Sequence, residues 1–201
     1  MEFKKFLKKT WKFIWEDDSF LSWLVNIVIA FVLVKFIIYP LLGLLLGTGF
    51  PVVAVVSCSM EHNDGIGQCS FGHEKFDSWF IKQNDIYEKL NINKNNFNDY
   101  RFSNGFNKGD IMVLTGYGEI NIGDVIVFRG AAQEPIIHRV VKLTKNEKEE
   151  VVYQTKGDNN IWSRADEFDI TEERYIGKAL FRIPYLGWVK LAFSSLITGK
   201  L

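Results

Sequence analysis

The pattern of hydrophobic and polar positions begins with one long apolar stretch, which covers residues 20–47. Its first part reads SFLSWLVNIVIAFVLVKFIIYP, and Asn26 and Lys35 are its only strongly polar interruptions. A membrane-spanning helix needs about 20 mostly apolar residues. Because apolar side chains surround the whole circumference, a buried core helix is less well matched. The run is also longer than the apolar part of a cleavable signal peptide. The pattern predicts a transmembrane helix over residues 19–47.

The segments at the two ends of the chain have a mixed apolar and basic character. Residues 1–18 interleave aromatic side chains with lysines, which is typical of an amphipathic helix at a membrane surface. This basic tail predicts that the N-terminus is cytoplasmic and that everything after about residue 50 lies outside. Residues 183–201 are apolar and contain Lys190, and they predict an interfacial helix or a short second membrane segment.

Short runs of alternating or β-branched residues dominate the rest of the chain. They predict strands at residues 52–57, 108–113, 122–127, 135–141, 150–155 and 175–183. Gly-Asp turns precede the second and third runs. Residues 61–107 interrupt the series as a polar insertion, with helical spacing of apolar residues at about 74–91. The expected fold is a mostly β extracytoplasmic domain over residues 48–182, with a partly helical insertion at its surface.

The overall charge argues against one class of partner. The chain has 24 Lys and Arg residues against 24 Asp and Glu residues, which gives a formal net charge of +0. Nucleic-acid-binding domains are normally clearly basic. We therefore expect no nucleic-acid partner, whereas the apolar segments predict contact with a lipid bilayer.

A few polar residues in the β region are candidates for chemistry. Ser59 stands at the end of a strand, His138 lies within an apolar strand, and Asp158 and Asp166 follow in polar turns. A serine is an effective nucleophile only when a base removes its proton and donors stabilise the oxyanion. Serine, histidine and aspartate in this chain order fit a serine protease triad. Sequence spacing alone does not show that they meet in space.

The order of these motifs resembles the type I signal peptidases of the archaeal and endoplasmic-reticulum type. SCSME at residues 57–61 resembles the serine box of that family, and PIIHRV at 135–140 resembles its histidine box. TKGDNN at residues 155–160 resembles its aspartate box. The strands that begin at KGD (residues 108–110) and IGD (residues 122–124) also match, as do YIGK at 175–178 and IPYLG at 183–187.

The resemblance implies a membrane-bound serine endopeptidase that removes signal peptides from secretory and membrane preproteins. It implies Ser59 as nucleophile, His138 as general base and Ser57 as a hydroxyl that helps to stabilise the oxyanion. The family's usual acid lies six residues after the position of Asp158, where this chain has Arg164. A two-residue loop insertion would make Asp166 the acid, and Asp158 is the alternative. No metal or cofactor is expected, and accessory subunits are conceivable partners.

A rival hypothesis rests on the order Cys58, His62, Cys69 and His73. Thiolates and imidazoles at short spacings can bind zinc, which would make the chain a membrane-anchored metal-binding or scaffolding domain without peptidase activity. The two cysteines could instead form a disulfide outside the cytoplasm or remain free. A self-cleaving, repressor-like serine protease is a further alternative, but such proteins are soluble and use lysine as the base.

Overall fold

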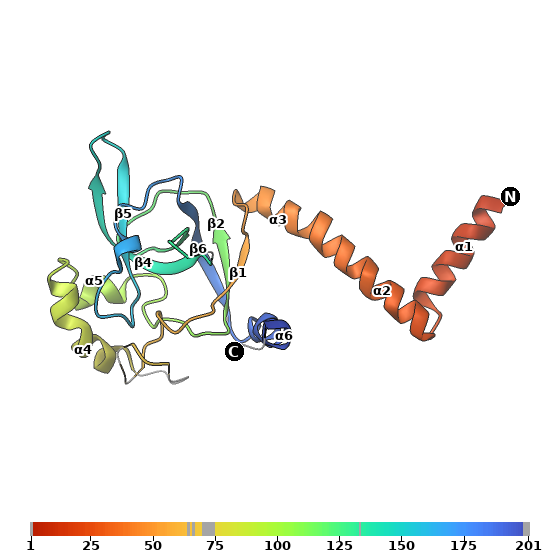
Figure 1. Cartoon of the computed structure of the whole chain (residues 1–201), viewed down its shortest axis with the longest axis horizontal. Coiled ribbons are helices and arrows are strands. Elements are labelled where there is room, and N and C mark those ends of the chain that lie inside the picture. Colours follow the sequence, from red (N-terminus) through yellow and green to blue (C-terminus); the bar gives the residue numbers. More distant parts are fainter. Residues whose placement is uncertain (1, 64, 66, 70–74, 133, 199–201) are drawn as a thin grey trace. The chain divides into compact units, whose positions relative to one another are not determined.

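The N-terminal part of the chain is helical and long enough to cross a membrane. A computed structural model describes residues 2–63, 65, 67–69, 75–132 and 134–198, and residues 1–45 and 46–201 form separate compact units. The first unit contains helix α1 (Glu2–Trp15), α2 (Phe20–Leu33) and the π-helical turn η1 (Val34–Ile38) (Figure 1). Helix α3 (Tyr39–Leu46) continues from η1. The continuous helix Phe20–Leu46 has a mean hydropathy of 2.6 and no buried residues in its most apolar window.

Local capping determines where this long helix begins. Ser19 adopts an extended backbone, and its hydroxyl accepts a hydrogen bond from the backbone N–H of Ser22 at 3.2 Å. Such a cap satisfies one of the N–H groups that the first turn of a helix leaves free. The apolar helix therefore starts directly after its cap, which follows the charged residues 16–18 between α1 and α2.

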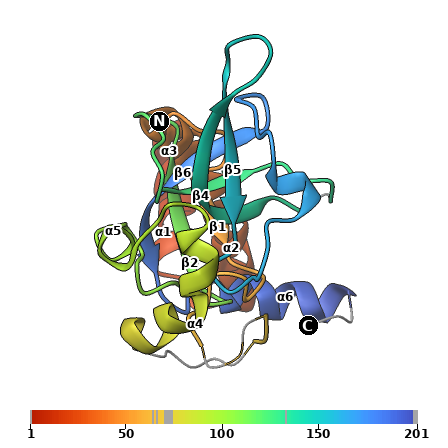
Figure 2. The ribbon, with the colours of Figure 1, turned by 90° about the vertical axis from the view of Figure 1, so that its left-hand side faces the viewer.

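The second unit is built on a six-stranded antiparallel sheet with strand order β1-β2-β6-β3-β4-β5. Its strands are β1 (Val52–Ala54), β2 (Ile111–Thr115), β3 (Val125–Phe128), β4 (Ile136–Lys145), β5 (Val151–Lys156) and β6 (Tyr175–Ile183). Each strand overlaps one of the runs predicted from the sequence. The Gly-Asp turns lie directly before β2 and β3. The β4–β5 hairpin projects from the sheet (Figure 2). The mostly β prediction is confirmed.

Two apolar clusters stabilise this sheet. The larger one includes residues of β2, β3 and β6 together with buried side chains from the segments that flank β1 and β2, namely Val55, Met60 and Phe106. The smaller one joins β3 and β4 to Ile170. Since Met60 is fully buried directly after Ser59, the core anchors the chain on the C-terminal side of the predicted nucleophile.

The insertion is partly helical, as predicted, but it has its own buried core. It contains helices α4 (Phe76–Glu88) and α5 (Lys94–Asn98). Its apolar, mostly aromatic residues pack together and against Val141 of β4, and the buried members are Trp79, Phe80, Tyr87, Ile92 and Phe97. The apolar positions with helical spacing therefore face the β domain, and the insertion is fixed to it.

The C-terminal segment ends in helix α6 (Trp188–Thr198). The segment before this helix is hydrogen-bonded to the turn that precedes β2, because the N–H of Gly187 donates to the carbonyl oxygen of Gly109 at 2.8 Å. Exposed apolar side chains precede and line this helix, including Tyr185, Val189 and Leu196. An 11-residue helix is only about 17 Å long, whereas the apolar layer of a membrane is about 30 Å thick.

Candidate active site

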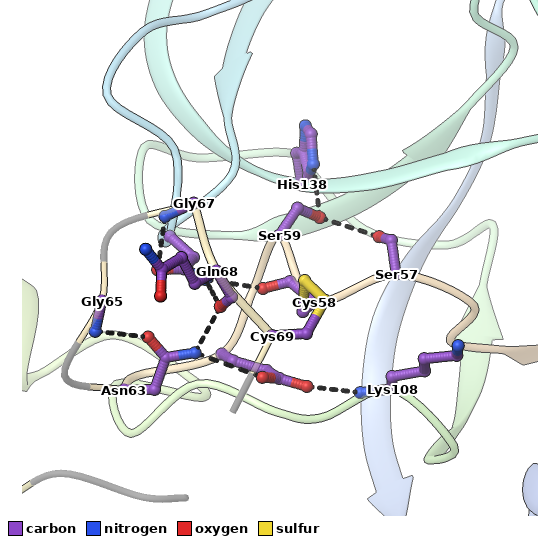
Figure 3. Close-up of a disulfide and its surroundings, with 12 residues drawn as sticks. Ser57, Cys58, Ser59, Asn63, Gly65, Gly67, Gln68, Cys69, Lys108 and His138 are labelled. Atoms are coloured by element: carbon purple, nitrogen blue, oxygen red, sulfur yellow. Dashed lines mark hydrogen bonds between the residues drawn. A yellow bond between two sulfur atoms is a disulfide. The ribbon is translucent and has the colours of Figure 1, made fainter. Parts of the chain in front are cut away.

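Ser59 lies just beyond β1, where the chain turns away from the sheet. Its backbone carbonyl accepts a hydrogen bond from the N–H of Asn159 at 2.8 Å, which ties it to the loop after β5. Its Oγ lies 3.1 Å from the Oγ of Ser57 (Figure 3). The two hydroxyls that the sequence places two residues apart are therefore neighbours in space.

His138 reaches Ser59 from strand β4. The residue pairs with Ile126 of β3, so its backbone is fixed by the sheet. Its side chain is almost fully buried, and its Nε2 lies 2.8 Å from the Oγ of Ser59 (Figure 3). A nucleophile and a base at hydrogen-bonding distance are the first two members of a serine protease triad.

Glu167 occupies the position of the third member. Its Oε1 contacts the Nδ1 of His138, and the side chain is completely buried. The hydroxyl of Thr155 donates to the same oxygen at 3.2 Å, and the backbone N–H of Arg164 donates to Oε2 at 2.7 Å. A carboxylate that accepts the Nδ1 proton leaves Nε2 as the acceptor for the serine hydroxyl.

The short 3₁₀ helix η2 (Ala165–Glu167) explains why Glu167, and neither predicted aspartate, reaches His138. Its turn directs Glu167 inward, whereas the neighbouring Asp166 accepts a hydrogen bond from the N–H of Ala131 at 3.1 Å. Asp166 also lies 3.4 Å from the guanidinium of Arg164. The sequence motifs predict an aspartate, although glutamate supplies the same carboxylate, and the residue that contacts His138 lies directly after Asp166 in the same acidic run.

Asp158, the other predicted acid, lies in a separate buried network. Its carboxylate accepts hydrogen bonds from the guanidinium of Arg139 at 2.9 and 2.6 Å and from the hydroxyl of Tyr87 at 3.0 Å. The Nε2 of His62 lies 3.0 Å from its Oδ2. Because Arg139 follows His138 in strand β4, the two side chains point to opposite faces of the sheet. Asp158 is bonded to Arg139 and therefore does not reach His138.

The charges of this network determine the protonation of its members. Burial alone would raise the pKa of Asp158, but the guanidinium of Arg139 and the hydrogen bond from His62 outweigh it and hold that pKa well below its ordinary value. Burial lowers the pKa of His62, although Asp158 opposes this change. Asp158 is therefore ionised and paired with Arg139.

Lys156 is a second buried cation beside the same network. Its ammonium group lies 3.2 Å from the Oε1 of Gln83 and 3.1 Å from the carbonyl oxygen of Gly157. Burial lowers its pKa to about 8, while Asp158 and Glu167 oppose the change. Lys156 contacts the insertion and the turn after β5, so it connects the insertion to the candidate site.

The two cysteines of the rival zinc hypothesis form a disulfide. Cys58 and Cys69 are bonded to each other with their Cα atoms 5.2 Å apart (Figure 3). Neither sulfur is then a thiolate that could bind a metal ion. His62 is hydrogen-bonded to Asp158, and His73 lies outside the described residues. Within the described part of the chain, no cluster of His, Cys, Asp or Glu could hold a metal ion.

Comparison with known proteins finds similar sequences, although no family model matches the chain. The chain is 30% identical over 95 residues to the "Signal peptidase complex catalytic subunit SEC11C" of Homo sapiens and of Canis lupus familiaris. This alignment covers 43% of the chain and 49% of each relative. The corresponding SEC11 protein of Leptosphaeria maculans is 30% identical over 97 residues, or 44% of the chain and 56% of that relative.

The chain thus spans about half the length of the curated relatives it matches. Their names describe catalytic subunits of signal peptidase complexes. Over the aligned residues, the chain is similar to these catalytic subunits, which confirms the resemblance drawn from the sequence motifs.

Proposed function

We propose that this chain is a membrane-anchored serine endopeptidase that removes signal peptides from preproteins. The observation that carries the proposal is the contact of Ser59 with His138 and of His138 with Glu167. Nucleophile, base and carboxylate stand in the order that acyl-transfer catalysis needs. The homology to catalytic subunits of signal peptidase complexes supports the choice of substrate.

The proposed reaction begins with proton transfer inside this triad. His138 Nε2 takes the proton of the Ser59 hydroxyl as Oγ attacks the scissile carbonyl. Glu167 holds the Nδ1 proton and stabilises the imidazolium that forms. His138 then donates the proton to the leaving amine, which leaves an acyl-enzyme on Ser59. Water, activated by the same imidazole, hydrolyses this ester and regenerates the serine.

The negative charge on the substrate oxygen needs donors beside the nucleophile. The hydroxyl of Ser57 lies 3.1 Å from the attacking oxygen and is one proposed donor. The backbone N–H of Ser59 is the other. In serine proteases, removal of one such donor lowers kcat by about 10²- to 10³-fold.

The proposed substrate requires the chain to be anchored at a membrane. The helix Phe20–Leu46 is proposed to cross the membrane once, with the basic α1 on the cytoplasmic side and the sheet outside. Helix α6 is proposed to lie in the membrane interface, because it is too short to span. Since the relatives are named as subunits of complexes, accessory subunits are proposed partners.

The preferred substrate is an extended segment with small residues at the first and third positions before the cut, as in the A-x-A sites of signal peptides. The test is incubation of the purified full chain in lipid vesicles with a secretory preprotein, followed by mass spectrometry of the new N-terminus. We expect one cut after the A-x-A site and a strong loss of cleavage when both alanines become leucine. A cut elsewhere, or equal cleavage of both substrates, would contradict the proposal.

Gly157 provides a test of how tightly the site is packed. A Cβ at this position would lie 2.8 Å from the carbonyl oxygen of Ser59 and 2.9 Å from the Nε2 of His138. We expect Gly157→Ala to lower kcat by about 100-fold, because a displacement of about 1 Å between reacting groups has an effect of that order. Gly49→Ala is the matched control, since no atom lies within 4 Å of its Cβ position. Cleavage rates within twofold of wild type for both variants would contradict this packing argument.

A further inference from the structure

The Cys58–Cys69 disulfide and Asn159 surround the peptide group that precedes Ser59. Cys58 lies between the two serines, and its sulfur is bonded to Cys69 at the far end of the following loop (Figure 3). Asn159 is buried and stands between the two arms of this loop. Its side-chain Nδ2 donates to the carbonyl oxygen of Cys58 at 3.1 Å and to that of Gln68 at 2.9 Å.

The backbone of Asn159 also forms hydrogen bonds with both arms of this loop. Its N–H donates to the carbonyl oxygen of Ser59 at 2.8 Å, and its carbonyl oxygen accepts from the N–H of Gly67 at 2.7 Å. Its Oδ1 also accepts from Gly67 at 3.2 Å. One buried residue therefore binds both arms of the loop that the disulfide closes. We refer to the disulfide and Asn159 together as the Asn159 clamp.

The clamp acts on the direction of one N–H group. The carbonyl of Cys58 and the N–H of Ser59 belong to the same planar trans peptide, in which C=O and N–H point in opposite directions. The hydrogen bond from Asn159 fixes the direction of the Cys58 carbonyl, and the N–H of Glu61 supports it at 3.1 Å. The N–H of Ser59 is thereby held in the opposite direction.

We propose that the Asn159 clamp is a positioning device that aims the N–H of Ser59 at the oxyanion, so that opening the disulfide reversibly lowers catalysis. This inference rests on the proposed peptidase function. An oxyanion donor contributes mainly to the transition state, and a donor aimed in the wrong direction lowers kcat while KM stays nearly unchanged. Asn159, Cys58 and Cys69 touch no reacting atom and act through Ser59.

The first test replaces Asn159 by aspartate in the full chain in lipid vesicles. Aspartate has nearly the same shape, but its carboxylate cannot donate to the carbonyl oxygens of Cys58 and Gln68. We expect Asn159→Asp to lower kcat by about 10- to 100-fold with KM within twofold of wild type. The exposed Asn96→Asp is the matched control and should leave both constants unchanged. If Asn159→Asp changes KM alone, or changes neither constant, the proposal is overturned.

The second test opens the disulfide with dithiothreitol. The S–S bond breaks, two cysteine thiols form, and the reagent is oxidised to its cyclic disulfide. We expect kcat of the wild type to fall at least fivefold, to recover on reoxidation with oxidised glutathione, and to be unaffected by the reagent in the Cys58→Ser/Cys69→Ser variant. A wild-type kcat that is equal before and after reduction overturns the proposal.

Amide hydrogen exchange separates failure of the clamp from failure of the proposed function. The N–H groups of Asn159 and Gly67 should exchange at least tenfold faster after reduction, because both are bonded inside the clamp. Equal exchange in the two states overturns the clamp. If the oxidised chain cleaves no preprotein while exchange accelerates on reduction, the peptidase proposal fails and the structural clamp stands.

Discussion

Replacing Glu167 by glutamine is expected to lower kcat by about 10³- to 10⁴-fold, with little change in KM. Glutamine keeps the size of the side chain, and its single amide oxygen can still accept from the backbone N–H of Arg164. Its amide N–H₂ can turn toward the Nδ1 of His138, which then acts as acceptor and leaves the proton on Nε2. That tautomer cannot take a proton from Ser59. The measurement is steady-state cleavage of a preprotein by the full chain.

Asp166 is the matched control for this substitution. It precedes Glu167 in the sequence, but its carboxylate bonds the N–H of Ala131 instead of His138. We expect Asp166→Asn to retain kcat within about threefold, because asparagine keeps an oxygen that can accept from Ala131 and the side chain does not contact His138. If Asp166→Asn loses activity to the extent expected for Glu167→Gln, while Glu167→Gln remains active, Asp166 is the triad acid.

Replacing Asp158 by asparagine is expected to reduce the free energy of unfolding by about 3 to 5 kcal/mol. The guanidinium of Arg139 is fully buried, and Asp158 supplies its only anionic partner among the described residues. Asparagine keeps the shape but leaves that charge uncompensated. The measurement is urea unfolding of the full chain in detergent micelles at pH 7.

Two further variants show whether charge is the cause. The exposed Asp85→Asn should change the free energy of unfolding by less than about 0.5 kcal/mol. An Arg139→Met/Asp158→Leu variant removes both charges and should recover part of the lost stability, since buried pairs can often be replaced by apolar residues. A loss below about 1 kcal/mol for Asp158→Asn would show that the pair contributes little.

The fold was largely predictable because local rules and tertiary structure agree. Strands β2 and β3 follow Gly-Asp turns, and the long helix begins at Phe20, as the hydrophobic pattern leads one to expect. The insertion was harder to interpret. Helical spacing predicted α4, but the depth at which Trp79 and Tyr87 are buried depends on contacts with β4 that no local pattern contains.

The candidate site was predictable in part for the same reason. Ser59 and His138 were singled out from their motifs, and the structure brings them together. The carboxylate that contacts His138 differs from both predicted aspartates, because its identity depends on how η2 turns, and adjacent residues of a short helix point in different directions. The motif around Asp158 made this residue a candidate acid, but Arg139 binds its carboxylate in a different network.

The proposed function requires Ser59 to be the nucleophile of a peptidase. We would first measure the rate of preprotein cleavage by Ser59→Ala in lipid vesicles, beside wild type and Ser57→Ala at equal protein concentration. We expect no cleavage above background for Ser59→Ala and reduced but measurable cleavage for Ser57→Ala, whose hydroxyl lies 3.1 Å from the proposed nucleophile. Cleavage by Ser59→Ala at the wild-type rate would show that Ser59 is not the nucleophile.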